Sequence, residues 1–114
     1  MKFEYQEFPL EMRKKDIFEL MQKYPDRVPV YIQSNTKEII LIKNKILINR
    51  DLTVGQLLFT IRSKIRITSD KALYILDETG NLPMTSQLMS DLYKNKKNID
   101  GCLYLSIHVE TTFG

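Results

Sequence analysis

Three residues in this sequence could take part in covalent chemistry: the single cysteine, the single histidine and the glycine of the segment HVETTFG. Cys102 and His108 are six positions apart in CLYLSIHV, a segment typical of a strand. Six strand residues span about 20 Å, too far for a nucleophile to hydrogen-bond its base. One cysteine and one histidine also cannot form a Cys/His zinc cage within one chain. We therefore expect no enzyme activity, no metal and no cofactor.

Gly114 follows a short uncharged stretch, TTF. Acyl transfer from a chain terminus requires that terminus to enter a narrow catalytic groove. Glycine has no Cβ, so a cysteine nucleophile can approach its carbonyl without a side-chain clash. Residues 110–114 span at most about 17 Å when extended, enough to leave a domain surface. The pattern fits a conjugation tail, and a chain cut at an arbitrary residue would look the same.

The composition is that of one soluble globular domain: 114 residues, 43% hydrophobic and 27% charged, with a net charge of +3. Basic residues cluster at 13–15, 43–45, 62–66 and 94–97. Such clusters are solvated surface or attract acidic peptides or anionic lipid. No stretch interleaves aromatic and basic residues like a stacking platform, so we expect no nucleic-acid partner. The single cysteine and the absence of a secretory signal or membrane-length apolar run indicate the cytoplasm.

Periodicity predicts helices in three places. The first 24 residues are typical of a short helix ended by Pro9 and a longer one with an apolar stripe at Leu10, Ile17, Leu20, Met21 and Tyr24. DLTVGQLLFTIRSKIR (51–66) is the clearest helix, with Thr53 and Gln56 at capping-box spacing. Its buried face is predicted to comprise Val54, Leu57, Leu58, Ile61 and Ile65. A short amphipathic helix is predicted at 86–94, on Leu88, Met89 and Leu92.

Four strands are predicted, at 27–33, 45–49, 72–76 and 102–109. Pro29 lacks a ladder donor, so its stretch is expected at an edge or a bulge. A turn is expected near Lys43 and Asn44, and another in DETGNLP (77–83).

The order strand, strand, helix, strand, short helix, strand is that of the ubiquitin-like β-grasp, an α+β fold. A four-stranded sheet packs on one central helix, and the two extra N-terminal helices dock elsewhere on the domain. We expect an N-terminal helical extension at 1–24, the β-grasp core at 25–110 and a flexible tail at 111–114.

Several blocks carry a family resemblance: KYPDRVPV (23–30), DLTVGQ (51–56), the final FG, MKFEY and LPMTSQLMSDLY. Together they cover essentially the whole chain. The sequence resembles the autophagy-related ubiquitin-like modifiers of the GABA-receptor-associated-protein and microtubule-light-chain-3 type.

This resemblance implies that Gly114 is joined to the amine of phosphatidylethanolamine by activating and conjugating enzymes. It implies a cysteine protease that exposes the glycine or removes the lipid. The protein would be cytoplasmic and, when lipidated, bound to the autophagosome membrane. There it would recruit cargo receptors through peptides with an aromatic residue, two intervening residues and an aliphatic one.

The peptide groove follows from the strand pattern and from the resemblance. Strand 45–49 is expected at a sheet edge, open to an added strand, with Lys45, Leu47 and Asn49 facing opposite to Ile46 and Ile48. The resemblance assigns the aromatic pocket to Asp16, Leu20, Pro29, Lys45, Leu47 and Cys102. It assigns the aliphatic pocket to Ile46, Ile48, Asn49, Leu52, Leu57 and Thr60. Contacts to acidic ligand residues fall to Arg27, Lys43, Lys45 and Lys64.

The sequence departs from the family pattern at both pockets. Cys102 replaces a frequent phenylalanine, Thr60 replaces an aliphatic residue, and the edge strand has Ile-Leu-Ile-Asn at 46–49 in place of Tyr-Leu-Val-Pro. These changes concern motif preference, and the fold prediction is unaffected. A non-conjugated trafficking adaptor that uses the same groove is the alternative function.

Overall fold

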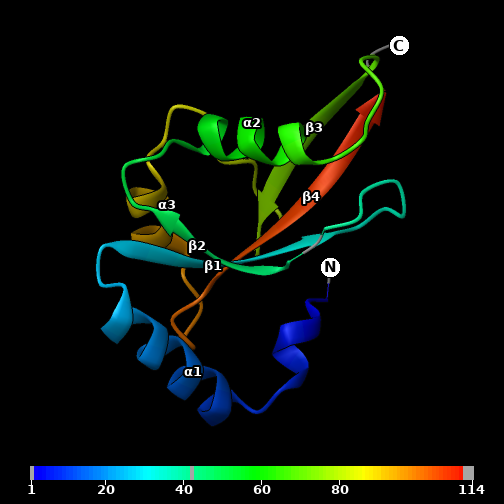
Figure 1. Ribbon diagram of the computed structural model, residues 1–114. Coiled ribbons are helices and arrows are strands. Elements are labelled where there is room, and N and C mark those ends of the chain that lie inside the picture. The colour runs from blue at the N-terminus through cyan, green and yellow to red at the C-terminus, as the bar shows by residue number, and fades with distance from the viewer. Residues whose placement is uncertain (1, 42, 112–114) are drawn as a thin grey trace.

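The computed structural model describes residues 2–41 and 43–111, in which one four-stranded sheet lies between two layers of helices (Figure 1). The chain begins with the 3₁₀ helix η1 (Glu4–Glu7) and the helix α1 (Leu10–Lys23). The sheet is formed by β1 (Arg27–Ser34), β2 (Lys45–Asn49), β3 (Lys71–Asp77) and β4 (Leu103–Thr111). Two further helices, α2 (Val54–Lys64) and α3 (Met89–Lys96), follow β2 and β3. This is the predicted α+β ubiquitin-like arrangement with a central helix and an N-terminal helical extension.

The sheet has the order β2-β1-β4-β3, so β2 and β3 are its edges. β1 pairs antiparallel with β2 and parallel with β4, and β3 pairs antiparallel with β4. The predicted edge position of residues 45–49 is confirmed.

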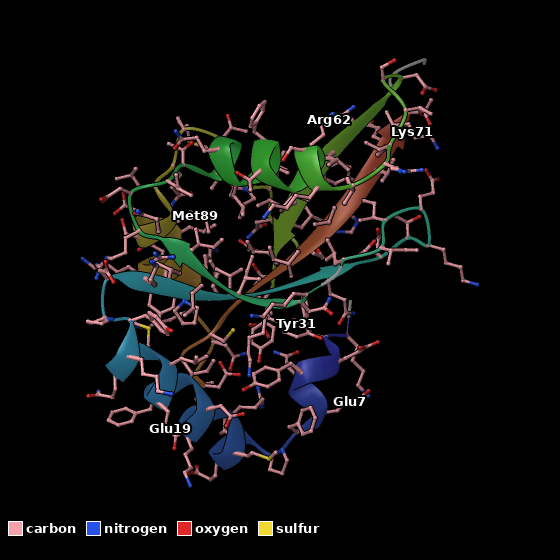
Figure 2. All side chains as sticks on the ribbon, viewed as in Figure 1. Glu7, Glu19, Tyr31, Arg62, Lys71 and Met89 are labelled. Atoms are coloured by element: carbon pink, nitrogen blue, oxygen red, sulfur yellow. The ribbon has the colours of Figure 1, made fainter. Side chains whose placement is uncertain are left out.

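The two faces of the sheet carry separate apolar clusters. Val30 and Ile32 of β1 pack with Leu57 of α2 on one face, which we call the α2 face. Tyr31, between them in sequence, packs on the other face with Ile17 of α1, and we call this the α1 face. Figure 2 shows Tyr31 directed toward the N-terminal helices. Alternation along β1 thus separates the two layers.

α2 begins with the predicted capping box. The Thr53 hydroxyl oxygen accepts a hydrogen bond from the Gln56 backbone N–H (3.1 Å), and the Gln56 side-chain oxygen accepts one from the Thr53 N–H (2.9 Å). This exchange satisfies two of the donors that a helix N-terminus otherwise leaves free.

Pro29 does not mark an edge strand, because β1 is an interior strand of the sheet. The ladder between β1 and β4 begins only at Val30, so Pro29 has no β4 partner. The Ile32 N–H donates to the carbonyl of Asn44, the residue just before β2 (2.8 Å). Because successive backbone N–H groups of a strand point to opposite sides, the nitrogen of Pro29, three residues earlier, points toward the β4 side. The lack of an N–H group on Pro29 therefore removes no hydrogen bond between β1 and β4. The prediction that Pro29 marks an edge strand or a bulge was wrong.

Two helix predictions need correction. The first helix is a single 3₁₀ turn, η1. α3 begins at Met89 instead of residue 86, because Leu88 forms a bridge with Thr53 and the Met89 N–H donates to the Leu52 carbonyl (2.7 Å). These contacts hold the chain extended, and Leu88 remains 38% exposed instead of joining the predicted buried face.

Candidate functional site: an edge strand between two apolar faces

β2 offers a free backbone edge. Only β1 pairs with it, so the other side of the strand has no ladder partner among the described residues. Such an edge can accept an added extended peptide through main-chain hydrogen bonds. The predicted alternation holds for three residues of β2: Ile46 and Ile48 pack on the α2 face, and Lys45 points to the α1 face. Leu47, predicted on the Lys45 side, borders the cavity beside Ile46 and Ile48.

A cavity of about 410 Å³ lies beside β2 on the α2 face. Four of the residues predicted for the aliphatic pocket line it: Ile46, Ile48, Leu57 and Thr60. Two others do not: Asn49 is exposed at the end of β2, and Leu52 packs against the α2-face core. Leu47 also borders the cavity from within β2.

The cavity continues past these residues toward the C-terminal end of α2. Buried Ile32 and Ile61 form its floor, and Ile40, Leu41 and Ile65 enclose its far end. Lys43 and Lys64 line it and are exposed, so both basic residues lie at its mouth. Arg27 lies at the other end of the edge, opposite Asn49, apart from these two lysines.

Four of the six residues predicted for the aromatic pocket lie on the α1 face near Tyr5: Asp16, Leu20, Lys45 and Cys102. The Tyr5 hydroxyl donates a hydrogen bond to the Asp16 carboxylate (3.2 Å), and the Lys45 ammonium lies 4.8 Å from the centre of the Tyr5 ring. Leu20 packs on the same cluster, and Cys102 is fully buried within it. Pro29 lies opposite Leu47 in the ladder.

Sequence reasoning missed the aromatic side chains that fill this face. Tyr5 stacks on Tyr31 with 5.6 Å between ring centres, and Phe3 lies 5.2 Å from Tyr104. The alternation of Tyr31 with Val30 and Ile32 was the available signal, because it places the tyrosine on the face away from α2.

Cys102 is buried in surroundings that keep its thiol unreactive, and His108 contacts Ser106 and Tyr74. Burial raises the pKa of the Cys102 thiol, and the nearby Asp100 carboxylate raises it further. Burial lowers the pKa of His108, whose ring lies 2.8 Å from the Ser106 hydroxyl and stacks on Tyr74. A protonated thiol is a poor nucleophile, so Cys102 is suited to packing.

Gly114, the predicted conjugation residue, lies outside the described residues. β4 runs to Thr111 and includes the first residue of the predicted tail. Among the described residues, no helix is long and apolar enough to cross a membrane.

Comparison with known proteins gives a consistent result. Residues 12–114 match the family described as "Autophagy protein Atg8 ubiquitin like". The chain is 41% identical to Autophagy-related protein 8e of Arabidopsis thaliana over 106 residues, covering 91% of this chain and 86% of that protein. It is 42% identical to Autophagy-related protein 8 of Coccidioides immitis over 111 residues, covering 95% and 93%. The crystal structure of Trypanosoma brucei ATG8 is similar, with a TM-score of 0.87, 29% identity and full coverage of both chains.

Proposed function

The chain belongs to the Atg8 family of ubiquitin-like autophagy proteins, and from that membership we propose that it is a modifier conjugated through Gly114 to phosphatidylethanolamine. The lipidated protein acts on autophagosomal membranes, and the free protein is cytoplasmic. Activating and conjugating enzymes attach the lipid, and a cysteine protease processes or delipidates the tail. The protein itself is a non-enzymatic module.

The chemistry of the tail supports this proposal. The family match includes Gly114, and β4 reaches Thr111 beside Lys71 at the start of β3. The division expected from the sequence is kept in this proposal, with 1–24 as the helical extension, 25–110 as the core and 111–114 as the conjugation tail, whose first residue, Thr111, is also the last residue of β4. A glycine carboxylate gives an enzyme thiol unhindered access to its carbonyl carbon.

The second part of the proposal is that β2 recruits cargo receptors that carry aromatic-x-x-aliphatic motifs. The observation that carries it is the open edge of β2 between the cavity on the α2 face and the Tyr5 cluster on the α1 face. An extended peptide directs alternate side chains to opposite faces, so one added strand can reach both. The aromatic anchor then lies near Lys45 and Leu47, and the aliphatic anchor enters the cavity near Ile48.

Conjugation is tested by Gly114→Ala in an assay with the activating and conjugating enzymes and vesicles containing phosphatidylethanolamine. We expect the lipid-dependent gel shift to disappear while the thermal midpoint is unchanged, because a terminal residue stabilises little. Glu110→Ala, an exposed change at the end of β4, is the matched control and should be lipidated normally. Undiminished lipidation of Gly114→Ala would exclude the modifier function. Peptide binding without any lipidation of the unaltered chain would favour the trafficking adaptor.

A further inference from the structure

The cavity on the α2 face has more apolar lining residues than were predicted for the aliphatic pocket. Its far end, lined by Ile40, Leu41 and Ile65, adds apolar surface beyond Ile48 and Thr60. Ile40 is 82% exposed although it borders this hollow, so a large apolar side chain stands at its rim. We call this part, between residues 40–41 and the C-terminal end of α2, the far subsite.

The direction of a bound peptide follows from the two proposed pockets. The aromatic pocket takes Lys45 and Leu47 from β2, and the aliphatic pocket takes Ile46 and Ile48, each one residue further along the strand, with Leu57 and Thr60 of α2. A peptide whose aromatic residue precedes its aliphatic one therefore runs parallel to β2. Its residues before the aromatic anchor then lie toward the N-terminal end of β2, where the far subsite opens beside Ile46 and Lys43.

Successive side chains of an extended peptide point to opposite faces of the sheet, and this determines which face each peptide side chain contacts. The aromatic anchor faces α1, and the aliphatic anchor, three positions later, faces α2. The residue directly before the aromatic anchor also faces α2. That position brings its side chain over the far subsite.

We propose that the far subsite binds an apolar side chain at the position directly before the aromatic anchor of an acidic peptide. This inference rests on the proposed peptide-binding function and adds a specificity determinant to it. Lys43 and Lys64 at the mouth select the charge of the flanking residues, since neither lysine forms an ion pair within residues 2–41 and 43–111.

A peptide fits this subsite better than a free fatty acid, although both could bring an apolar group and a carboxylate. The far subsite is continuous with the open edge of β2. A peptide satisfies the exposed backbone groups of that edge, and an acyl chain leaves them to water. The geometry therefore favours an extended chain that uses the edge and the cavity together.

The test compares three synthetic peptides that differ only directly before the aromatic anchor, where they carry Leu, Ala or Asp. All three keep acidic residues further upstream and are titrated calorimetrically into the full chain. We expect the Leu peptide to bind about tenfold more tightly than the Ala peptide, as full burial of a leucine side chain implies. The Asp peptide should bind no better than the Ala peptide.

Ile40→Asp supplies the protein side of the comparison. Ile40 is 82% exposed, so the change should leave the fold intact while placing a carboxylate at the rim of the far subsite. The advantage of Leu over Ala should fall to less than about threefold, a coupling that a double-mutant cycle measures. Ile99→Asp is the matched control, because Ile99 is 73% exposed and does not line the cavity. It should retain the full advantage.

Each alternative result overturns the inference in a recognisable way. Equal affinity for the Leu and Ala peptides would leave the groove in place and remove the far subsite. An equal loss of the advantage in Ile40→Asp and Ile99→Asp would show a nonspecific charge effect. No binding of any peptide to the folded chain would overturn the peptide-binding function as well. Binding of oleate to the cavity with no Leu advantage would assign the far end to lipid.

Discussion

Arg13 of α1 and Asp100, two residues before the cysteine that precedes β4, form a buried ion pair with 2.7 Å between Nη1 and Oδ2. The Asp100 side chain is fully buried, and that of Arg13 is 11% exposed. The same carboxylate accepts a hydrogen bond from the Tyr104 hydroxyl (2.5 Å) and one from the Cys102 N–H (2.8 Å). This network attaches the N-terminal helix, which carries Asp16 and Leu20, to the sheet.

Asp100→Ala should destabilise the protein by about 3–5 kcal/mol, because it leaves a buried guanidinium and two further donors without their acceptor. The free energy of unfolding in urea measures this loss. Glu11→Ala removes the exposed pair between Glu11 and Lys14 on the same helix (3.8 Å) and should cost less than about 0.5 kcal/mol. Similar losses for both variants would show that the Arg13–Asp100 pair does not anchor α1.

Short-range patterns predicted the elements that rest on local physics. The Thr53–Gln56 capping box and the apolar period of α2 lie within a few residues of each other, and the structure contains both. The limits 45–49 of β2 were also correct, since a turn and a β-branched run define them.

The features that the sequence did not predict depend on packing between segments that are far apart in the chain. Asp100 lies in a polar turn that is typical of exposed residues, and its burial depends on Arg13, 87 positions away. Pro29 suggested an edge because the sequence does not show where the β1–β4 ladder begins. The extent of the cavity was hidden for the same reason, since Ile40 and Ile65 belong to segments that meet only in the folded chain.

Cys102 should resist alkylation in the folded protein. Its side chain is fully buried, and burial together with Asp100 raises the pKa of the thiol, so the native thiol stays protonated at pH 8–9. Iodoacetamide should label the chain only in denaturant, as mass spectrometry would show. Ser63→Cys, which adds an exposed thiol on α2, should give one rapidly labelled site in native buffer. Rapid labelling of the unaltered chain would reopen the possibility that Cys102 is a nucleophile.

Lys45 and Lys64 should accelerate and strengthen the binding of acidic-flanked peptides. Lys64 stands at the mouth of the cavity and Lys45 beside Tyr5, so their charges flank β2 on both faces. Replacing both with alanine should reduce the association rate at low salt more than at high salt, because salt screens exposed charges. Stopped-flow mixing over a range of ionic strength measures the effect. Lys94→Ala with Lys97→Ala, the same charge change at the C-terminal end of α3, should leave the rate and its salt dependence nearly unchanged.

Leu47 is the residue whose replacement most directly tests β2 as the docking edge. It lies in the middle of β2, opposite Pro29, and is half-buried. Two buried anchors and a few backbone bonds, offset by the ordering of the peptide, give an expected affinity on the order of micromolar.

Leu47→Ala removes apolar contact and should weaken binding about tenfold. Leu47→Arg places a charge in the middle of the proposed docking edge, between the two proposed pockets, and should abolish binding, with a modest decrease in thermal stability. Leu82→Arg makes the same change at a 66% exposed leucine in the loop after β3 and should bind normally. Calorimetric titration of one aromatic-x-x-aliphatic peptide into all four proteins decides the question. Equal affinity for Leu47→Arg and the unaltered chain would mean that peptides dock elsewhere than on β2.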